Sequence, residues 1–140
     1  MEENIGGVER RKSIRFSKEI TLRFVIFDSF ASDERKEDLR PREGKISNIS
    51  AGGVRISTSD LDEKDLEALR SNRARLALRF SLEEKSCDIN ATAQVKWMVK
   101  ANTEEGKSKF VIGLEFLDIS SEDRNRIVQF IISQRFPSLH

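Results

Sequence analysis

Apolar side chains alternate with polar ones along several segments of this 140-residue chain, the period of two that is typical of half-buried β-strands. The alternation is clearest at residues 20–26, 76–80, 89–97 and 110–116, and shorter candidates lie at 45–48 and 54–56. No long helical segment separates these candidates. The sequence therefore predicts a mainly β fold, a six-stranded antiparallel β-barrel.

One amphipathic helix is expected to end the chain. Ser120 stands three residues before Asp123, which is the spacing of a helix N-cap, and apolar residues then recur at helical intervals until Pro137. The helix is predicted over 121–135, where it would cover the barrel's open end or an edge. A shorter helical segment of one or two turns is predicted within 61–69.

The segments between these elements are polar. Residues 1–19 are interpreted as a flexible N-terminal arm that leads into the first strand at 20, residues 28–43 as a long charged loop and residues 48–53 as a turn. As domains, the sequence predicts a flexible N-terminus at 1–8, one barrel domain at 9–136 and a tail at 137–140.

Charge and composition restrict the partners. The net charge is +1, so we expect no general attraction to long nucleic acid or to an anionic membrane, and an anion site must be a local cluster. No apolar run is long enough to cross a membrane, and the N-terminus lacks the pattern of a secretory signal. A single cysteine, Cys87, excludes an intrachain disulfide and agrees with a reducing cytoplasm.

The residues that catalysis needs are mostly missing. The only histidine is the last residue, His140, which is a poor place for a catalytic imidazole or a metal ligand. Neither a P-loop nor a Gly-x-Gly-x-x-Gly loop occurs. A pair of catalytic carboxylates is not excluded by a chain with 24 acidic residues, but most of these belong to a solvated surface. The chain is predicted to be a binding module rather than an enzyme, with no cofactor.

Two short patterns carry the chemistry. The first is Arg11-x-x-x-Arg15, with Arg10 beside it, and the second is Asn48-x-Ser50-x-x-Gly53. The arginine pair alone is weak evidence for a ligand site, because such pairs are expected by chance in an arginine-rich chain. The second pattern is more specific, although Asn, Ser and Gly are also common turn formers, so a purely structural turn remains an alternative.

Together, and in this order, the two patterns resemble those of the PilZ domain family. Further along, Ala93-x-Val95-x-Trp97 and Gly113-Leu-Glu-Phe116 look like the family's later strands, so the resemblance covers roughly residues 9–135. It implies a six-stranded barrel that binds the bacterial second messenger cyclic di-GMP. By matching position, the ligand-binding residues would be Arg11, Arg15, Asn48, Ser50 and Gly53. Asn stands where many members have Asp, and the 28–43 loop is long.

The residue types suit that ligand. An arginine fork matches guanine O6 and N7, and its plane can stack on a purine. Arg10 is expected to pair with a phosphate, or to be solvated. Trp97 can stack on a base, but its alternation with Ile89, Ala93 and Val95 puts it on an apolar face, which favours core packing.

Two other kinds of binding module remain as alternatives. One is a small barrel of the OB type that binds nucleic acid, which the near-zero net charge disfavours. The other is a PilZ-fold adaptor that binds protein and no ligand. The predicted receptor changes the conformation of its N-terminal arm on binding, because this polar segment cannot stay ordered alone and its arginines repel one another until an anion is bound. It would signal to an unidentified downstream protein of motility, polysaccharide or biofilm machinery.

Overall fold

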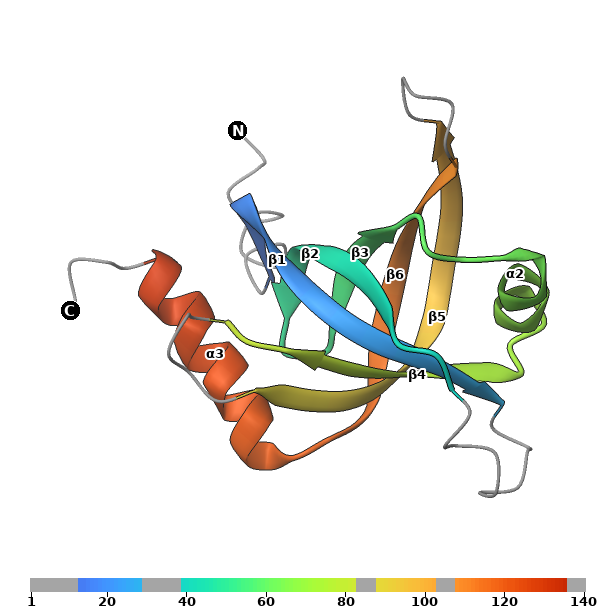
Figure 1. Ribbon diagram of the computed structural model, residues 1–140. Coiled ribbons are helices and arrows are strands. Elements are labelled where there is room, and N and C mark those ends of the chain that lie inside the picture. The colour runs from blue at the N-terminus through green and yellow to red at the C-terminus, as the bar shows by residue number, and fades with distance from the viewer. Residues whose placement is uncertain (1–12, 29–38, 83–87, 103–107, 136–140) are drawn as a thin grey trace, which may run out of the picture.

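The predicted barrel is confirmed by the computed structural model, in which six antiparallel strands close on themselves (Figure 1). The structure describes residues 13–28, 39–82, 88–102 and 108–135, without the side chains of 13–19, 102 and 135. Its elements are β1 (Ser13–Asp28), β2 (Arg42–Ser50), β3 (Gly53–Thr58), α2 (Glu63–Arg70), β4 (Ala74–Phe80), β5 (Ile89–Asn102), β6 (Ser108–Ile119) and α3 (Ser121–Arg135). Around the barrel the strands follow the order β1-β2-β3-β6-β5-β4.

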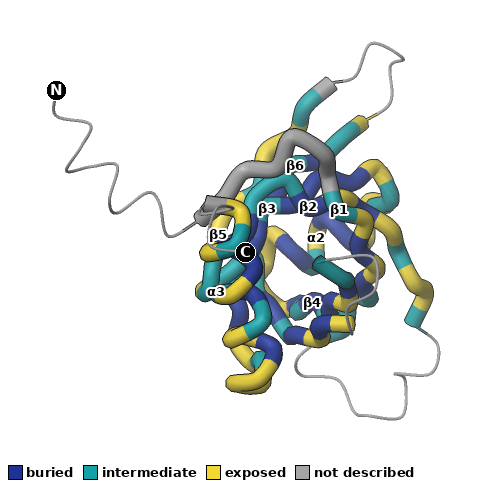
Figure 2. The backbone as a smooth tube through the Cα atoms, turned by 90° about the vertical axis from the view of Figure 1, so that its left-hand side faces the viewer, coloured by how far each residue is buried: buried dark blue, intermediate teal, exposed yellow. Residues whose placement is uncertain are grey.

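The barrel interior is filled by the apolar residues of the alternating pattern. Leu22, Phe24, Ile46, Ile56 and Ile112 are all at most 2% exposed. In Figure 2 the buried positions alternate with exposed ones along the strands. Large branched and aromatic side chains fill this interior, so a binding site is expected on the outer surface of the barrel.

Helices α2 and α3 lie at opposite ends of the barrel (Figure 1). Both were predicted, and both are confirmed. Helix α2 begins with a capping box in which Asp65 N–H donates to Asp62 Oδ1 and Asp62 N–H donates to Asp65 Oδ2, each at 2.9 Å. Helix α3 is capped by Ser120, whose Oγ accepts from Asp123 N–H at 3.0 Å. Its residues Ile127, Phe130 and Ile131 belong to the buried core.

The first strand begins earlier than the sequence predicts. Ser13, Ile14 and Arg15 pair with Ser50, Ile49 and Asn48 of β2, so residues 13–19 belong to β1 and not to a flexible arm. The reason is tertiary. These residues lack the alternation of a half-buried strand, and the hydrogen-bond ladder of β2 holds them instead. Residues 1–12 lie outside the described part of the chain.

The predicted loop and turn are also shorter than expected. β1 continues to Asp28 and β2 begins at Arg42, so strand residues take both ends of the predicted 28–43 loop. The predicted 48–53 turn is mostly strand as well, because only Ala51 and Gly52 lie between β2 and β3.

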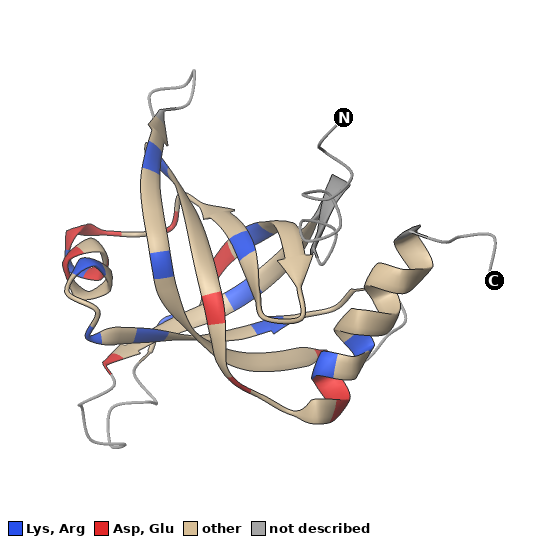
Figure 3. Ribbon diagram, turned by 180° about the vertical axis from the view of Figure 1, so that it is seen from behind, with Lys and Arg blue, Asp and Glu red and all other residues tan. Residues whose placement is uncertain are grey.

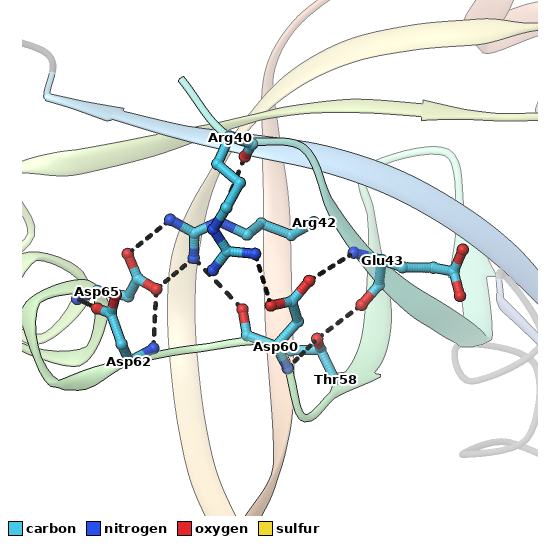
Figure 4. A network of polar contacts seen from close by, with 7 residues as sticks. All are labelled: Arg40, Arg42, Glu43, Thr58, Asp60, Asp62 and Asp65. Atoms are coloured by element: carbon cyan, nitrogen blue, oxygen red, sulfur yellow. Dashed lines mark hydrogen bonds and ion pairs between the residues drawn. The ribbon is translucent and has the colours of Figure 1, made fainter. Parts of the chain in front are cut away.

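A buried ion pair ties the start of β2 to α2 (Figure 4). The Arg42 guanidinium binds both carboxylate oxygens of Asp65, and the two side chains are each 10% exposed. The hydrogen bond to Asp65 raises the pKa of Arg42 above its ordinary value. Nearby, Arg40 pairs with Asp60 at 2.9 Å on the surface. No helix in the described part of the chain is long and apolar enough to cross a membrane.

Candidate functional site on the outer face of the barrel

Asn48 and Ser50 project from the end of β2 to the outside of the barrel. Ile49, between them, is completely buried, so its two neighbours point outward by the alternation of a strand. Across the hairpin, Asn48 lies opposite Arg55 and Ser50 lies opposite Gly53. The two-residue hairpin therefore gathers the polar residues of the second motif on one outer face.

The first motif reaches the same face through β1. The Cα of Arg15 lies opposite that of Asn48, and the Cα of Ser13 lies opposite that of Ser50. The antiparallel register of two strands thus brings together two patterns that are about thirty residues apart in the sequence. Arg10 and Arg11 lie outside the described residues, and so does the side chain of Arg15.

Ser50 and Gly53 have structural roles in the hairpin. The Ser50 hydroxyl accepts from Gly52 N–H at 3.2 Å and donates to Gly53 O at 3.4 Å. A Cβ on Gly53 would overlap the carbonyl oxygen of Leu114 on β6, so this position needs glycine for the close approach of two strands. The alternative of a structural turn is therefore supported for these two residues.

Asn48 differs from them. Its side-chain amide makes no hydrogen bond with any residue that the structure describes, and it is half-buried at the surface. An amide offers one acceptor and two donors. Asn48 is therefore available to a ligand in a way that the Ser50 hydroxyl, already engaged by the turn, is not.

Trp97 lies on the outer surface, so the interpretation that it packs in the core is wrong. Ala91 and Ala93 of β5 point inward, but the register shifts between Val95 and Trp97, which leaves Lys96 as an extra residue. This β-bulge reverses the alternation, so that Met98 packs against the core and Trp97 is 46% exposed. No local sequence pattern marks the bulge, and a strict period of two predicts the opposite face for Trp97.

The bulge places Trp97 in line with the motif residues. Successive cross-strand pairs form one row over five strands, which consists of Arg15, Asn48, Arg55, Gly113 and Trp97. A shallow depression of about 390 Å³ runs along this row. It is lined by Asn48, Ser50, Gly52, Gly53, Val54, Arg55, Lys96, Trp97, Gly113, Leu114 and Glu115.

The charge of the depression suits an anion. Arg55 and Lys96 line it, and its one carboxylate, Glu115, is engaged by Gln94 at 2.9 Å and by Lys96 at 3.7 Å. Elsewhere, basic and acidic positions are interspersed over the described part of the barrel (Figure 3). A continuous basic stripe of the kind that follows a nucleic-acid backbone is absent from that part.

Arg55 is the site residue that the sequence reasoning missed. Its neighbours Val54 and Ile56 are buried, so the alternation alone predicts that Arg55 points outward beside Asn48. Arg55 belongs to neither motif, so the motifs alone do not indicate it.

A larger depression of about 680 Å³ lies elsewhere, where Arg23, Ala77, Arg79, Asn90 and Thr92 are among the lining residues. Beside this depression, hydrogen bonds from Ser81 and, as the next largest cause, from Arg79 hold the pKa of the Asp88 carboxyl below its ordinary value. None of the predicted site residues lines this depression. In the described residues, no group of three or more His, Cys, Asp or Glu side chains could hold a metal ion.

The chain matches a known domain family. The sequence profile of the PilZ domain matches residues 9–133. The chain belongs to the PilZ domain family. The resemblance to this family that the sequence shows is thereby confirmed. A comparison with curated proteins finds no match.

Solved structures of PilZ proteins share the fold. MrkH from K. pneumonia in its apo state has a TM-score of 0.64 at 20% identity, over 89% of this chain and 51% of MrkH. The PilZ domain of YcgR from Escherichia coli, with c-di-GMP, has a TM-score of 0.54 at 13% identity, over 86% of this chain and 91% of that domain. PlzA from Borreliella burgdorferi, in complex with c-di-GMP, has a TM-score of 0.55 at 15% identity, over 99% of this chain and 57% of PlzA. This PilZ chain spans about half the length of MrkH.

Proposed function

We propose that this PilZ domain is a cyclic di-GMP receptor and binds its ligand on the outer row that Arg15, Asn48, Arg55, Gly113 and Trp97 form. The observation that carries the proposal is the register of β1 and β2, which puts Arg15 directly beside Asn48. Solved relatives that are described with c-di-GMP support the choice of ligand.

The chemistry of the row suits a cyclic dinucleotide of guanine. Each guanine presents the acceptors O6 and N7, which an arginine fork binds with two parallel hydrogen bonds. The amide of Asn48 can donate to and accept from a base edge. Arg10 and Arg11, which precede β1 by two or three residues, supply further positive charge for the two phosphates.

We further propose that the domain acts by binding and not by catalysis, in the reducing cytoplasm. Ligand binding would draw the segment before Ser13 onto the outer row, because the phosphates offset the repulsion between its arginines. A downstream protein of motility, polysaccharide or biofilm machinery would read that change. Since Ser13–Arg15 already pair with β2, the change is confined to residues before Ser13.

A calorimetric titration tests the binding. We expect saturable binding of cyclic di-GMP and none of GMP, GTP or a short single-stranded DNA at the same concentrations. Arg15→Ala should weaken binding about tenfold or more, because a charge-assisted bidentate contact is worth ~1.5–3 kcal/mol. Arg23→Ala is the matched control, since this exposed arginine lies on the same strand and away from the row. Equal affinity of a folded Arg15→Ala variant and of the control would refute the proposed site.

The proposed movement has its own test. Cleavage by trypsin after Arg10, Arg11 and Lys12 should slow when cyclic di-GMP is saturating. Binding without any change in that cleavage rate would reject the movement and leave the binding site in place.

A further inference from the structure

Arg55 lies in the middle of the outer row, where no family motif places a ligand contact. On one side its Cα pairs with that of Asn48, and on the other side with that of Gly113, which in turn pairs with Trp97. One strand, β6, therefore lies between Arg55 and Trp97, and its residue at this point is a glycine, which has no side chain.

The Arg55 side chain is held on one edge by Ser47, and its other edge has no partner among the described residues. Its Nε donates to Ser47 Oγ at 3.2 Å, while the same hydroxyl donates to Arg55 O at 3.4 Å. Ser47 can do both because it is the extra residue at a register shift in β2. The two terminal nitrogens of Arg55 have no hydrogen bond or ion pair with any described residue. The guanidinium is therefore positioned in advance, with unused donors beside the depression.

The Trp97 side chain lies across Gly113. A Cβ on Gly113 would overlap the indole ring atoms, so the ring covers the position where a side chain would otherwise project from β6. The ring remains 46% exposed. An exposed indole face fixed against a sheet is a stacking platform for a flat ring.

We propose that Arg55 and Trp97 form a guanine-selective subsite of this domain, in which the base stacks on Trp97 and the free edge of Arg55 donates to its N7 and O6. The inference rests on the proposed function, because it assumes a dinucleotide on the outer row. Adenine has a donor, its amino group, at the place of guanine O6. Arg55 therefore selects cyclic di-GMP over cyclic di-AMP.

The protein carries a built-in reporter for this subsite. Trp97 is the only tryptophan and the chain has no tyrosine, so its intrinsic fluorescence comes from the proposed platform alone. Stacking of a guanine on the indole should quench this fluorescence. Titration of the wild type with cyclic di-GMP and with cyclic di-AMP then measures both affinities at the subsite itself.

Variants of Arg55 provide the test. In Arg55→Ala, we expect the affinity for cyclic di-GMP to fall about tenfold or more and that for cyclic di-AMP to change far less, because only guanine loses a bidentate pair. Arg55→Lys keeps the charge but lacks the fork, and should lose most of the same preference. Arg23→Ala, on the same barrel but away from the row, should retain it.

The outcomes separate this inference from the proposed function. If Arg55→Ala and Arg55→Lys keep both wild-type affinities while Arg15→Ala loses binding, the domain is a cyclic di-GMP receptor and Arg55 has no part in recognition. If the wild type binds neither nucleotide, the proposed function and the subsite are both overturned. Binding of cyclic di-GMP without any change in Trp97 fluorescence overturns the platform.

Discussion

The glycines of the β2–β3 hairpin lead to a prediction in which two adjacent residues behave in opposite ways. A Cβ on Gly53 would overlap the Leu114 carbonyl oxygen, whereas a Cβ on Gly52 would have no atom within 4 Å. Gly52 also has a φ outside the left-handed region, so alanine is compatible with its backbone. Alanine is therefore expected to be harmful at Gly53 and harmless at Gly52.

The size of the effect on the free energy of unfolding follows from the atoms that a Cβ on Gly53 would displace. Overpacking against a fixed neighbour costs ~1–3 kcal/mol, and a weakened hydrogen bond of the β3–β6 ladder costs ~0.5–1.5 kcal/mol. Gly53→Ala should therefore lower the free energy of unfolding by about 2–4 kcal/mol. Gly52→Ala should leave it unchanged or raise it by up to about 1 kcal/mol, because alanine reduces the entropy of the unfolded chain.

Urea unfolding, followed by far-UV circular dichroism and by Trp97 fluorescence, measures both values. At roughly 3 °C for each kcal/mol, Gly53→Ala should also lower Tm by about 6–12 °C. A Gly53→Ala variant as stable as Gly52→Ala would show that β3 and β6 do not approach closely at this point. The glycine of the motif would then have to be explained by the ligand.

Three further predictions concern the ion pair, a helix cap and the site. Arg42→Ala should lower the free energy of unfolding, measured with urea, by about 3–5 kcal/mol, because the variant leaves the buried Asp65 carboxylate without its cation. Arg40→Ala is the control: its ion pair with Asp60 is exposed, so its loss should cost less than about 1 kcal/mol. The hydrogen bond from the Asp65 backbone N–H lowers the pKa of Asp62 below its ordinary 3.8, so the Asp62 carboxylate stabilises the fold above that value and loses this contribution as pH falls through the lowered pKa. Asp62→Asn keeps a helix cap, and the stability of this variant relative to the wild type should rise only in that acidic range. A difference in stability that is constant at every pH would contradict the assignment. Asn48→Ala should leave Tm nearly unchanged, because the Asn48 amide has no partner in the described structure, and should weaken cyclic di-GMP binding in calorimetry. A lower Tm with unchanged affinity would make Asn48 a structural residue.

The sequence was informative where one periodic pattern decided the structure. Alternation over 20–26 and 76–80 predicted strands whose alternating apolar residues are buried, as Leu22 and Leu76 are, or partly buried, as Ile20 is. Helical spacing together with Ser120 and Pro137 predicted α3 correctly. These elements could be predicted because burial of one face is a local property of the chain.

The predictions from the sequence were wrong where pairing between strands that are distant in the sequence determines the structure. Pairing with β2, and not any local pattern, makes Ser13–Arg15 part of β1. The bulge at Lys96 depends on the register of β5 against β6, so the outward position of Trp97 could not be obtained by counting residues. The family resemblance implied that the arginine and asparagine patterns act together, but only the register shows that Arg55 and Trp97 lie in the same row.

Amide hydrogen exchange with and without cyclic di-GMP tests the central claim most directly, because it reports whether the ligand binds and where. Saturating ligand should increase protection most at residues 9–12 and 47–54, with a smaller increase around Trp97 and Gly113 and little change in α3. Unchanged protection throughout, or an increase confined to the strands around Arg23 and Arg79, would contradict binding on the outer row.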